Sequence, residues 1–194
     1  MTETKSSKQI EEFDDEDDFD KPVVQLYKCE WPFMLQSDKD YDATNSSVPN
    51  LILEDLYHGD AADASKPKLL AALDIKAMIC AIKGMVFNQP HHANMNILHI
   101  KIDDNPKDHA NTLEPYVDTI CKFVDENRKA GNKILSFCMM GISRSSSVNI
   151  IIIMYLSGWK LDAHGALEYL RSRRTCCKPA IGFMEQLEVI RQKK

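Results

Sequence analysis

The stretch KILSFCMMGISRSSSVNIIIIMYL, residues 133–156, decides the fold of this chain. It opens with the apolar run 133–137, passes through a short loop that contains Gly141, and continues into a segment that is apolar on nearly every side. Short aliphatic runs bounded by a glycine loop are typical of buried strands, and a helix that is apolar all round lies in the middle of a domain. The stretch therefore predicts a central strand, a tight loop and a buried helix in direct succession.

The loop in this stretch has the composition of an anion-binding site. Cys138 stands where the strand ends, and Arg144 follows six residues later at the start of the helix. At such a junction, backbone N–H groups and the positive end of the helix dipole converge and favour the thiolate form of a cysteine. The planar donor fork of arginine fits two oxygens of a phosphoryl group. A buried structural cysteine and a surface arginine are the alternative, but this placement favours a nucleophile and a charge clamp.

Outward from this stretch, apolar runs alternate with helical periods. The alternation predicts one α/β domain, with a mostly parallel central sheet flanked by helices. Ser65 and Asp162 are the expected N-caps of two of the helices, and Gly131 is the expected stop of a third. Further strands are predicted at 51–53, 75–82 and 97–102, and further helices at 67–73, 113–124, 162–173 and 183–192.

Two acidic residues follow the predicted strand 97–102. Functional crevices of open α/β sheets lie at the C-terminal ends of the strands, so Asp103 and Asp104 are candidates for a site shared with the Cys138 loop. A turn or a helix cap is the alternative role of an aspartate pair at a strand end.

The charge of the chain is concentrated at its N-terminus. The net charge is −5, yet residues 1–20 hold nine Asp or Glu against two Lys, so the remainder is nearly neutral. We expect a disordered acidic tail at 1–22, an irregular N-terminal arm at 23–48 and one folded domain at 49–192. The tail is either a solubilising extension or a docking segment for a basic partner. The nearly neutral remainder argues against nucleic acid as a partner.

The composition of the chain also bears on the cellular compartment in which the protein is expected. The longest apolar run is far shorter than a bilayer span, and the N-terminus lacks the pattern of a secretory signal, so no membrane association is expected. The six cysteines then read as thiols in a reducing compartment, the cytoplasm or the nucleus. The adjacent pairs Cys176–Cys177 and His91–His92 lack zinc-ligand spacing, so no metal site is expected.

Residues 137–145, Phe-Cys-Met-Met-Gly-Ile-Ser-Arg-Ser, resemble the signature H-C-x2-G-x-S-R-S of the small, atypical dual-specificity protein phosphatases of the cysteine-dependent protein tyrosine phosphatase superfamily. The resemblance extends over residues 49–190, including LILEDLYHG at 51–59 and the pairs Gly158–Trp159, Arg173–Arg174 and Gly182–Phe183.

The resemblance implies a hydrolase that removes phosphate from phosphotyrosine, and from phosphoserine or phosphothreonine, through a phosphocysteine intermediate, without metal or cofactor. Cys138 would be the nucleophile, Arg144 would hold the phosphoryl oxygens, and Ser145 would assist release of the sulfur. Asp104 is the expected general acid, with Asp103 and Asp108 as alternatives, because the loop before Leu113 is longer than usual. The residues expected to bind phosphate are Met139, Met140, Gly141, Ile142 and Ser143.

One position departs from the signature, because Phe137 stands in place of the histidine before the cysteine. The resemblance implies that this histidine stabilises the thiolate, so we expect Cys138 to titrate higher than in relatives that keep it, yet lower than a free thiol. The departure favours an alternative function, a weakly active or inactive phosphatase-like adapter that binds phosphorylated proteins. A sulfurtransferase of the rhodanese type is a second alternative, since that fold also has a catalytic cysteine loop before a helix.

Overall fold

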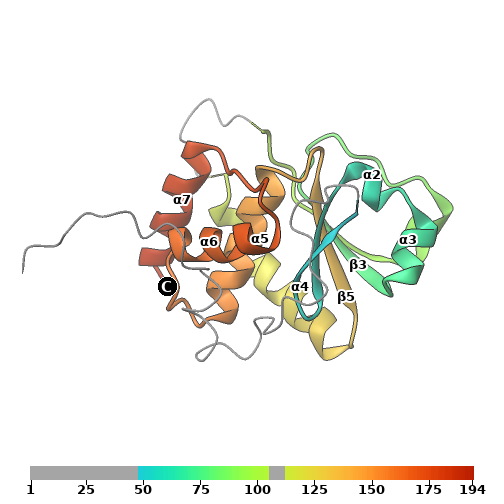
Figure 1. Cartoon of the computed structure of the whole chain (residues 1–194), viewed down its shortest axis with the longest axis horizontal. Coiled ribbons are helices and arrows are strands. Elements are labelled where there is room, and N and C mark those ends of the chain that lie inside the picture. Colours follow the sequence, from blue (N-terminus) through green and yellow to red (C-terminus); the bar gives the residue numbers. More distant parts are fainter. Residues whose placement is uncertain (1–47, 105–111) are drawn as a thin grey trace, which may run out of the picture.

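The computed structural model of the chain describes residues 48–104 and 112–194. The predictions for the acidic tail, for the N-terminal arm up to residue 47 and for Asp108 lie outside the described residues. Within those ranges, the helices and strands fall inside the predicted domain 49–192 (Figure 1).

A single mixed sheet forms the centre of the described structure. The strand order is β1-β2-β5-β3-β4, with β1 antiparallel to β2 and every other neighbouring pair parallel. The prediction of a mostly parallel sheet is therefore confirmed. The strands are β1 (Asn50–Leu53), β2 (Leu56–Asp60), β3 (Ile75–Cys80), β4 (Asn96–His99) and β5 (Lys133–Cys138).

Helices cover both faces of the sheet. In Figure 1, α5, α6 and α7 gather on one side of the strands, and α2 and α3 lie on the other. Helix α5 packs on β5 and touches α4, α6 and α7, while α3 packs on β3. The α-helices are α2 (Ala61–Ala64), α3 (Pro67–Ala72), α4 (Val117–Lys129), α5 (Arg144–Leu156), α6 (Ala163–Arg173) and α7 (Ile181–Gln192), and the 3-10 helices are η1 (Pro90–Asn94) and η2 (Glu114–Tyr116).

Helix α5 is the buried helix that the sequence predicts. Every residue from Arg144 to Met154 is buried, and the aliphatic side chains of the helix belong to the main hydrophobic core. A helix with neighbours on all sides needs no polar face, which explains why residues 148–154 are apolar nearly all round. The strand–loop–helix unit thus lies at the centre of the domain.

Three predicted details are wrong. Ser65 does not cap α3: it ends α2, where its hydroxyl donates to the Ala61 carbonyl at 2.8 Å, and Lys66 precedes α3. The strand expected at 97–102 ends at His99, because the Ile102 N–H turns back to the Ile100 carbonyl at 3.1 Å and leaves the ladder. The sequence also predicts one opening strand where the structure has the hairpin β1–β2.

Two predicted helix ends are confirmed. Gly131 follows α4 with a φ of 71°, the left-handed conformation typical of helix ends. Asp162 caps α6, since its Oδ1 accepts the Gly165 N–H at 2.7 Å. This bond satisfies one of the N–H groups that the first turn of a helix leaves without a partner.

The Asp162 cap gives a stability prediction. Replacing an N-cap aspartate by alanine removes the acceptor and costs about 1 kcal/mol, whereas asparagine is an equally good cap. We expect Asp162→Ala to lower the free energy of unfolding in urea by about 1 kcal/mol and Asp162→Asn to stay close to the wild type. Equal losses in both variants would show that the carboxylate matters through its charge and not as a cap.

Candidate active site

The loop between β5 and α5, residues 139–143, turns on Gly141. Its φ is 62°, in the left-handed region, and a Cβ at this position would lie 2.6 Å from the Gly59 carbonyl oxygen and 2.8 Å from Nη2 of Arg174. Neither the backbone angle nor the space admits a side chain. The glycine therefore lets the loop bend tightly over the end of β5.

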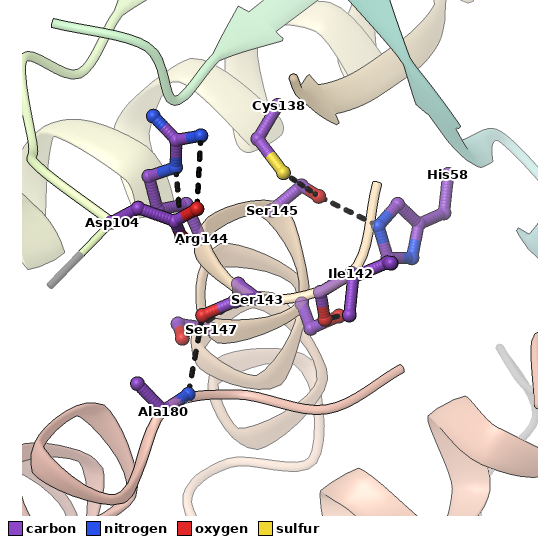
Figure 2. A network of polar contacts seen from close by, with 10 residues as sticks. His58, Asp104, Cys138, Ile142, Ser143, Arg144, Ser145, Ser147 and Ala180 are labelled. Carbon is purple, nitrogen blue, oxygen red and sulfur yellow. Dashed lines mark hydrogen bonds and ion pairs between the residues drawn. The ribbon is translucent and has the colours of Figure 1, made fainter. Parts of the chain in front are cut away.

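The loop is held from the far side by the connection between α6 and α7. Three consecutive loop residues each bond to this connection, which fixes the direction of the loop backbone. The bonds run from Arg174 Nε to the Gly141 carbonyl (3.1 Å), from the Lys178 N–H to the Ile142 carbonyl (2.8 Å) and from the Ala180 N–H to the Ser143 hydroxyl (3.1 Å), the last drawn in Figure 2.

The sulfur of Cys138 lies beneath this loop and is almost fully buried. The Ser145 hydroxyl donates to it at 3.1 Å, and the backbone N–H groups of Ile142 and Ser145 point at it as well. Burial alone would raise the pKa of Cys138, but these hydrogen bonds and the charge of Arg144 outweigh burial, so its pKa is lowered. Cys138 therefore ionises more readily than an ordinary thiol, as the sequence predicts.

The Arg144 guanidinium faces the carboxylate of Asp104 (Figure 2). Nε lies 3.2 Å from Oδ1 and Nη2 lies 3.4 Å from Oδ2, with the arginine side chain 10% exposed and the aspartate 58% exposed. Asp103, the predicted alternative, instead pairs with Lys83 at 2.8 Å. Of the two candidate acids that lie within the described residues, Asp104 is thus the one that contacts Arg144.

The two methionines of the loop are among the exposed large apolar side chains. Met139 and Met140 therefore form an apolar rim beside the buried sulfur, while Gly141 is buried and Ile142 and Ser143 are half-buried. The structure brings Cys138, Arg144, Ser145 and Asp104 together, and their catalytic roles remain predictions.

The sequence patterns do not reveal one residue of the site. His58 on β2 is fully buried, and its Nε2 lies 2.8 Å from the Ser145 hydroxyl. The pairing of β2 with β5 places His58 opposite Ser136, on the sheet face that also carries Cys138, whereas the buried Phe137 points to the other face. The one signal in the sequence is a histidine in the short run LYHGD at 56–60, and the strand register is needed to relate it to the loop.

The adjacent cysteine and histidine pairs have other contacts. Cys177 Sγ lies 3.5 Å from Nδ1 of His58, and the rings of His91 and His92 pack on each other at 4.1 Å. Among the residues that the structure describes, His, Cys, Asp and Glu side chains nowhere gather in threes around a possible metal ion. In the same residues, every helix is too short or too polar to cross a bilayer.

Comparison with known proteins agrees with this geometry. The family described as dual specificity phosphatase, catalytic domain, matches residues 56–193. Dual specificity protein phosphatase 1 of Homo sapiens is 32% identical over 141 residues, which are 72% of this chain and 36% of that protein. Dual specificity protein phosphatase 1 of Arabidopsis thaliana is 29% identical over 145 residues, which are 74% of this chain and 69% of that protein. The chain thus spans little more than a third of the human relative.

Solved structures share the fold. Human DUSP28 superposes with a TM-score of 0.66 at 22% identity, covering 75% of this chain and 93% of that one. The human tyrosine phosphatase-like serine/threonine/tyrosine-interacting protein also superposes with a TM-score of 0.66, at 27% identity, covering 75% of this chain and 97% of that one.

The contacts of Cys138 predict its titration. A hydrogen bond to a charged group contributes about 1.5–3 kcal/mol, or about one to two pKa units. Ser145→Ala removes one such bond and should raise the pH midpoint of Cys138 alkylation by iodoacetamide by about one unit. Ser147→Ala is the matched control, because the Ser147 hydroxyl donates to the Ser143 carbonyl and not to the sulfur. Alkylation is measured by peptide-level mass spectrometry across pH 5–10. An unchanged midpoint in Ser145→Ala would contradict the prediction.

Proposed function

The chain belongs to the dual specificity phosphatase family, and on that premise we propose that it is a cysteine-dependent phosphatase of phosphorylated protein side chains. The observation that carries the proposal is the Cys138 sulfur, whose lowered pKa results from loop amides, the Ser145 hydroxyl and the charge of Arg144. The same groups that stabilise a sulfur anion are placed to stabilise a phosphoryl oxyanion.

In the first step, the Cys138 thiolate attacks phosphorus in line with the leaving oxygen. The S–P bond forms while the P–O bond to the substrate side chain breaks. Arg144 and the loop N–H groups hold the equatorial oxygens, and protonated Asp104 gives its proton to the departing oxygen. The products are the phosphocysteine and a free tyrosine, serine or threonine hydroxyl.

In the second step, water attacks the phosphocysteine. The Asp104 carboxylate, left ionised by the first step, takes a proton from the water, and the sulfur leaves as a thiolate with its electron pair. The Ser145 hydroxyl, 3.1 Å from the sulfur, donates to the charge that develops there. Inorganic phosphate leaves, and both Cys138 and Asp104 return to their starting states.

The ion pair of Asp104 with Arg144 suggests how substrate enters. The two carboxylate oxygens contact Nε and Nη2, the donors that a phosphoryl group would also use. A phosphoryl group must therefore displace the carboxylate from the guanidinium. Once displaced from Arg144, the carboxylate lies beside the phosphoryl group, where it must take up a proton from the solvent before it acts as the general acid of the first step.

The apolar rim supports a protein side chain as the substrate. Met139 and Met140 are exposed and uncharged, and Ile142 between them and the helix is also apolar. A polyphosphate would need cations at these positions to balance its additional charges. A singly phosphorylated side chain, with a hydrocarbon stem, fits an apolar rim around one anion site.

A phosphatase-like adapter is the second candidate. Phe137 replaces the signature histidine, and one of the similar structures is that of a human protein whose name describes it as phosphatase-like and interacting. The adapter would bind phosphorylated proteins at the same loop with little or no turnover. The sulfurtransferase alternative is excluded by the family match.

Cys138→Ser tests whether the Cys138 thiolate is the nucleophile. We expect the wild type to hydrolyse a chromogenic aryl phosphate without added metal, unaffected by EDTA and inhibited by vanadate, because nucleophile and charge stabiliser are both protein groups. Cys138→Ser should lose at least about 1,000-fold in kcat, as is typical when a nucleophile is removed. Activity that survives in the variant would exclude the mechanism, and phosphopeptide binding without turnover in the wild type would favour the adapter.

Asp104→Asn tests both proposed roles of the Asp104 carboxylate, as the general acid and as the ion-pair partner of Arg144. General acid catalysis contributes about 10²–10⁴-fold, so turnover of phosphopeptides should fall by that factor, with a smaller loss for aryl phosphates that have good leaving groups. Inhibition by inorganic phosphate should become stronger, because the anion no longer competes with a carboxylate for Arg144. Asp103→Asn is the matched control. If Asp103→Asn shows this pattern and Asp104→Asn does not, Asp104 is not the acid.

A further inference from the structure

His58 lies behind the candidate active site, in contact with its serine. The side chain is 0% exposed and comes from β2, a different strand from the one that carries the cysteine. Figure 2 shows the line of contacts from His58 through Ser145 to Cys138. His58 Nε2 lies 2.8 Å from Ser145 Oγ, which lies 3.1 Å from the sulfur.

Counting the protons assigns the donors in this line. A serine hydroxyl has one proton, and here it points to the Cys138 sulfur. The Ser145 oxygen is therefore an acceptor toward His58, and Nε2 must carry the hydrogen of that contact. A neutral imidazole has a single N–H, so Nδ1 is then an acceptor.

The other neighbours of the ring agree with this tautomer. Burial and the positive charge of Arg174 at the end of α6 hold the pKa of His58 well below its usual value, so the ring is neutral. On the Nδ1 side stands Cys177 Sγ, 3.5 Å away. Burial raises the pKa of Cys177 to about 12, so this thiol keeps its proton and can donate it to Nδ1.

We propose that His58 is a positioning residue, whose Nε2–H holds the Ser145 hydroxyl in the orientation that donates to the Cys138 sulfur. The hydrogen-bonded line then runs in one direction, from the Cys177 thiol through the imidazole and the serine to the sulfur. Any effect of this hydrogen-bonded line on turnover rests on the proposed function. In that mechanism a fixed donor stabilises the sulfur both as nucleophile and as leaving group.

A purely structural role for His58 makes different predictions. A buried histidine that only fills space between β2 and α5 could be replaced by leucine without changing the titration of Cys138. An imidazole that orients Ser145 cannot be replaced by leucine without changing that titration, because without the imidazole the Ser145 hydroxyl is free to rotate toward other acceptors. The discriminating measurement is therefore the pH midpoint of Cys138 alkylation and not stability.

Three substitutions at His58 distinguish the roles of the two ring nitrogen atoms. Glutamine places an amide N–H near the position of Nε2, and asparagine places one near Nδ1. We expect His58→Leu and His58→Asn to raise the alkylation midpoint by about half a pH unit, which leaves about threefold less thiolate at a fixed lower pH. His58→Gln should keep the wild-type midpoint. A variant that merely loosens the fold would instead expose Cys80 and Cys177 to alkylation.

A double-mutant comparison tests whether His58 acts through Ser145. In the Ser145→Ala background the hydroxyl is absent, so His58→Leu should produce no further shift of the midpoint. An unchanged midpoint in the single variant His58→Leu would overturn the proposal. A shift of equal size in both backgrounds would overturn it too, because His58 would then act on the sulfur without the serine.

The tautomer can be read directly in the wild-type chain. Long-range ¹H–¹⁵N correlation spectra at neutral pH should show His58 with a protonated Nε2 and a bare Nδ1. A protonated Nδ1 with a bare Nε2, or a charged ring, would overturn the proposal even if no variant folds. Neither the alkylation measurement nor the tautomer measurement requires turnover. Either can contradict the role of His58 while phosphatase activity is present, or support it while phosphatase activity is absent.

Discussion

The close approach of Gly141 to the carbonyl of Gly59 is the constraint on which the site depends. A side chain at residue 141 would collide with this carbonyl at 2.6 Å, so the loop can lie against the end of β2 only with a glycine there. The bend lets the N–H groups of Ile142 and Ser145 reach the Cys138 sulfur. The backbone part of the anion site therefore follows from the close packing of the loop on β2, and the side chains add to it.

The cysteines of the domain show what that packing achieves. Cys80, Cys138 and Cys177 are all buried, and burial is the largest influence on the pKa of each. In Cys80 and Cys177 it raises the pKa to about 12. In Cys138 the loop amides, the Ser145 hydroxyl and the Arg144 charge reverse its effect. Residue type and burial do not distinguish a reactive thiol from an inert one, but directed hydrogen bonds do.

Polar groups from distant parts of the chain meet here because parallel strands end at the same edge of the sheet. Asp104 arrives from the segment after β4 and contacts Arg144 at the start of α5. Arg174, at the end of α6, donates to the Gly141 carbonyl, and its charge adds to the effect of burial in lowering the pKa of His58. Arg144 and Arg174 are buried, so their charges act away from bulk water, where such interactions are stronger than at an exposed surface, whereas Asp104 reaches Arg144 from the exposed side.

The sequence by itself determined the parts of this protein that rest on local patterns. Residues 133–156 specify a strand, a glycine loop and a buried helix, because side-chain periodicity and the glycine act over a few positions, and Cys138 and Arg144 are fixed within that loop by their spacing. Only the tertiary structure decided which aspartate faces Arg144 and that His58 stands behind Ser145. These contacts depend on strand register and on the course of the chain after β4, where a shift of one residue turns a side chain to the opposite face.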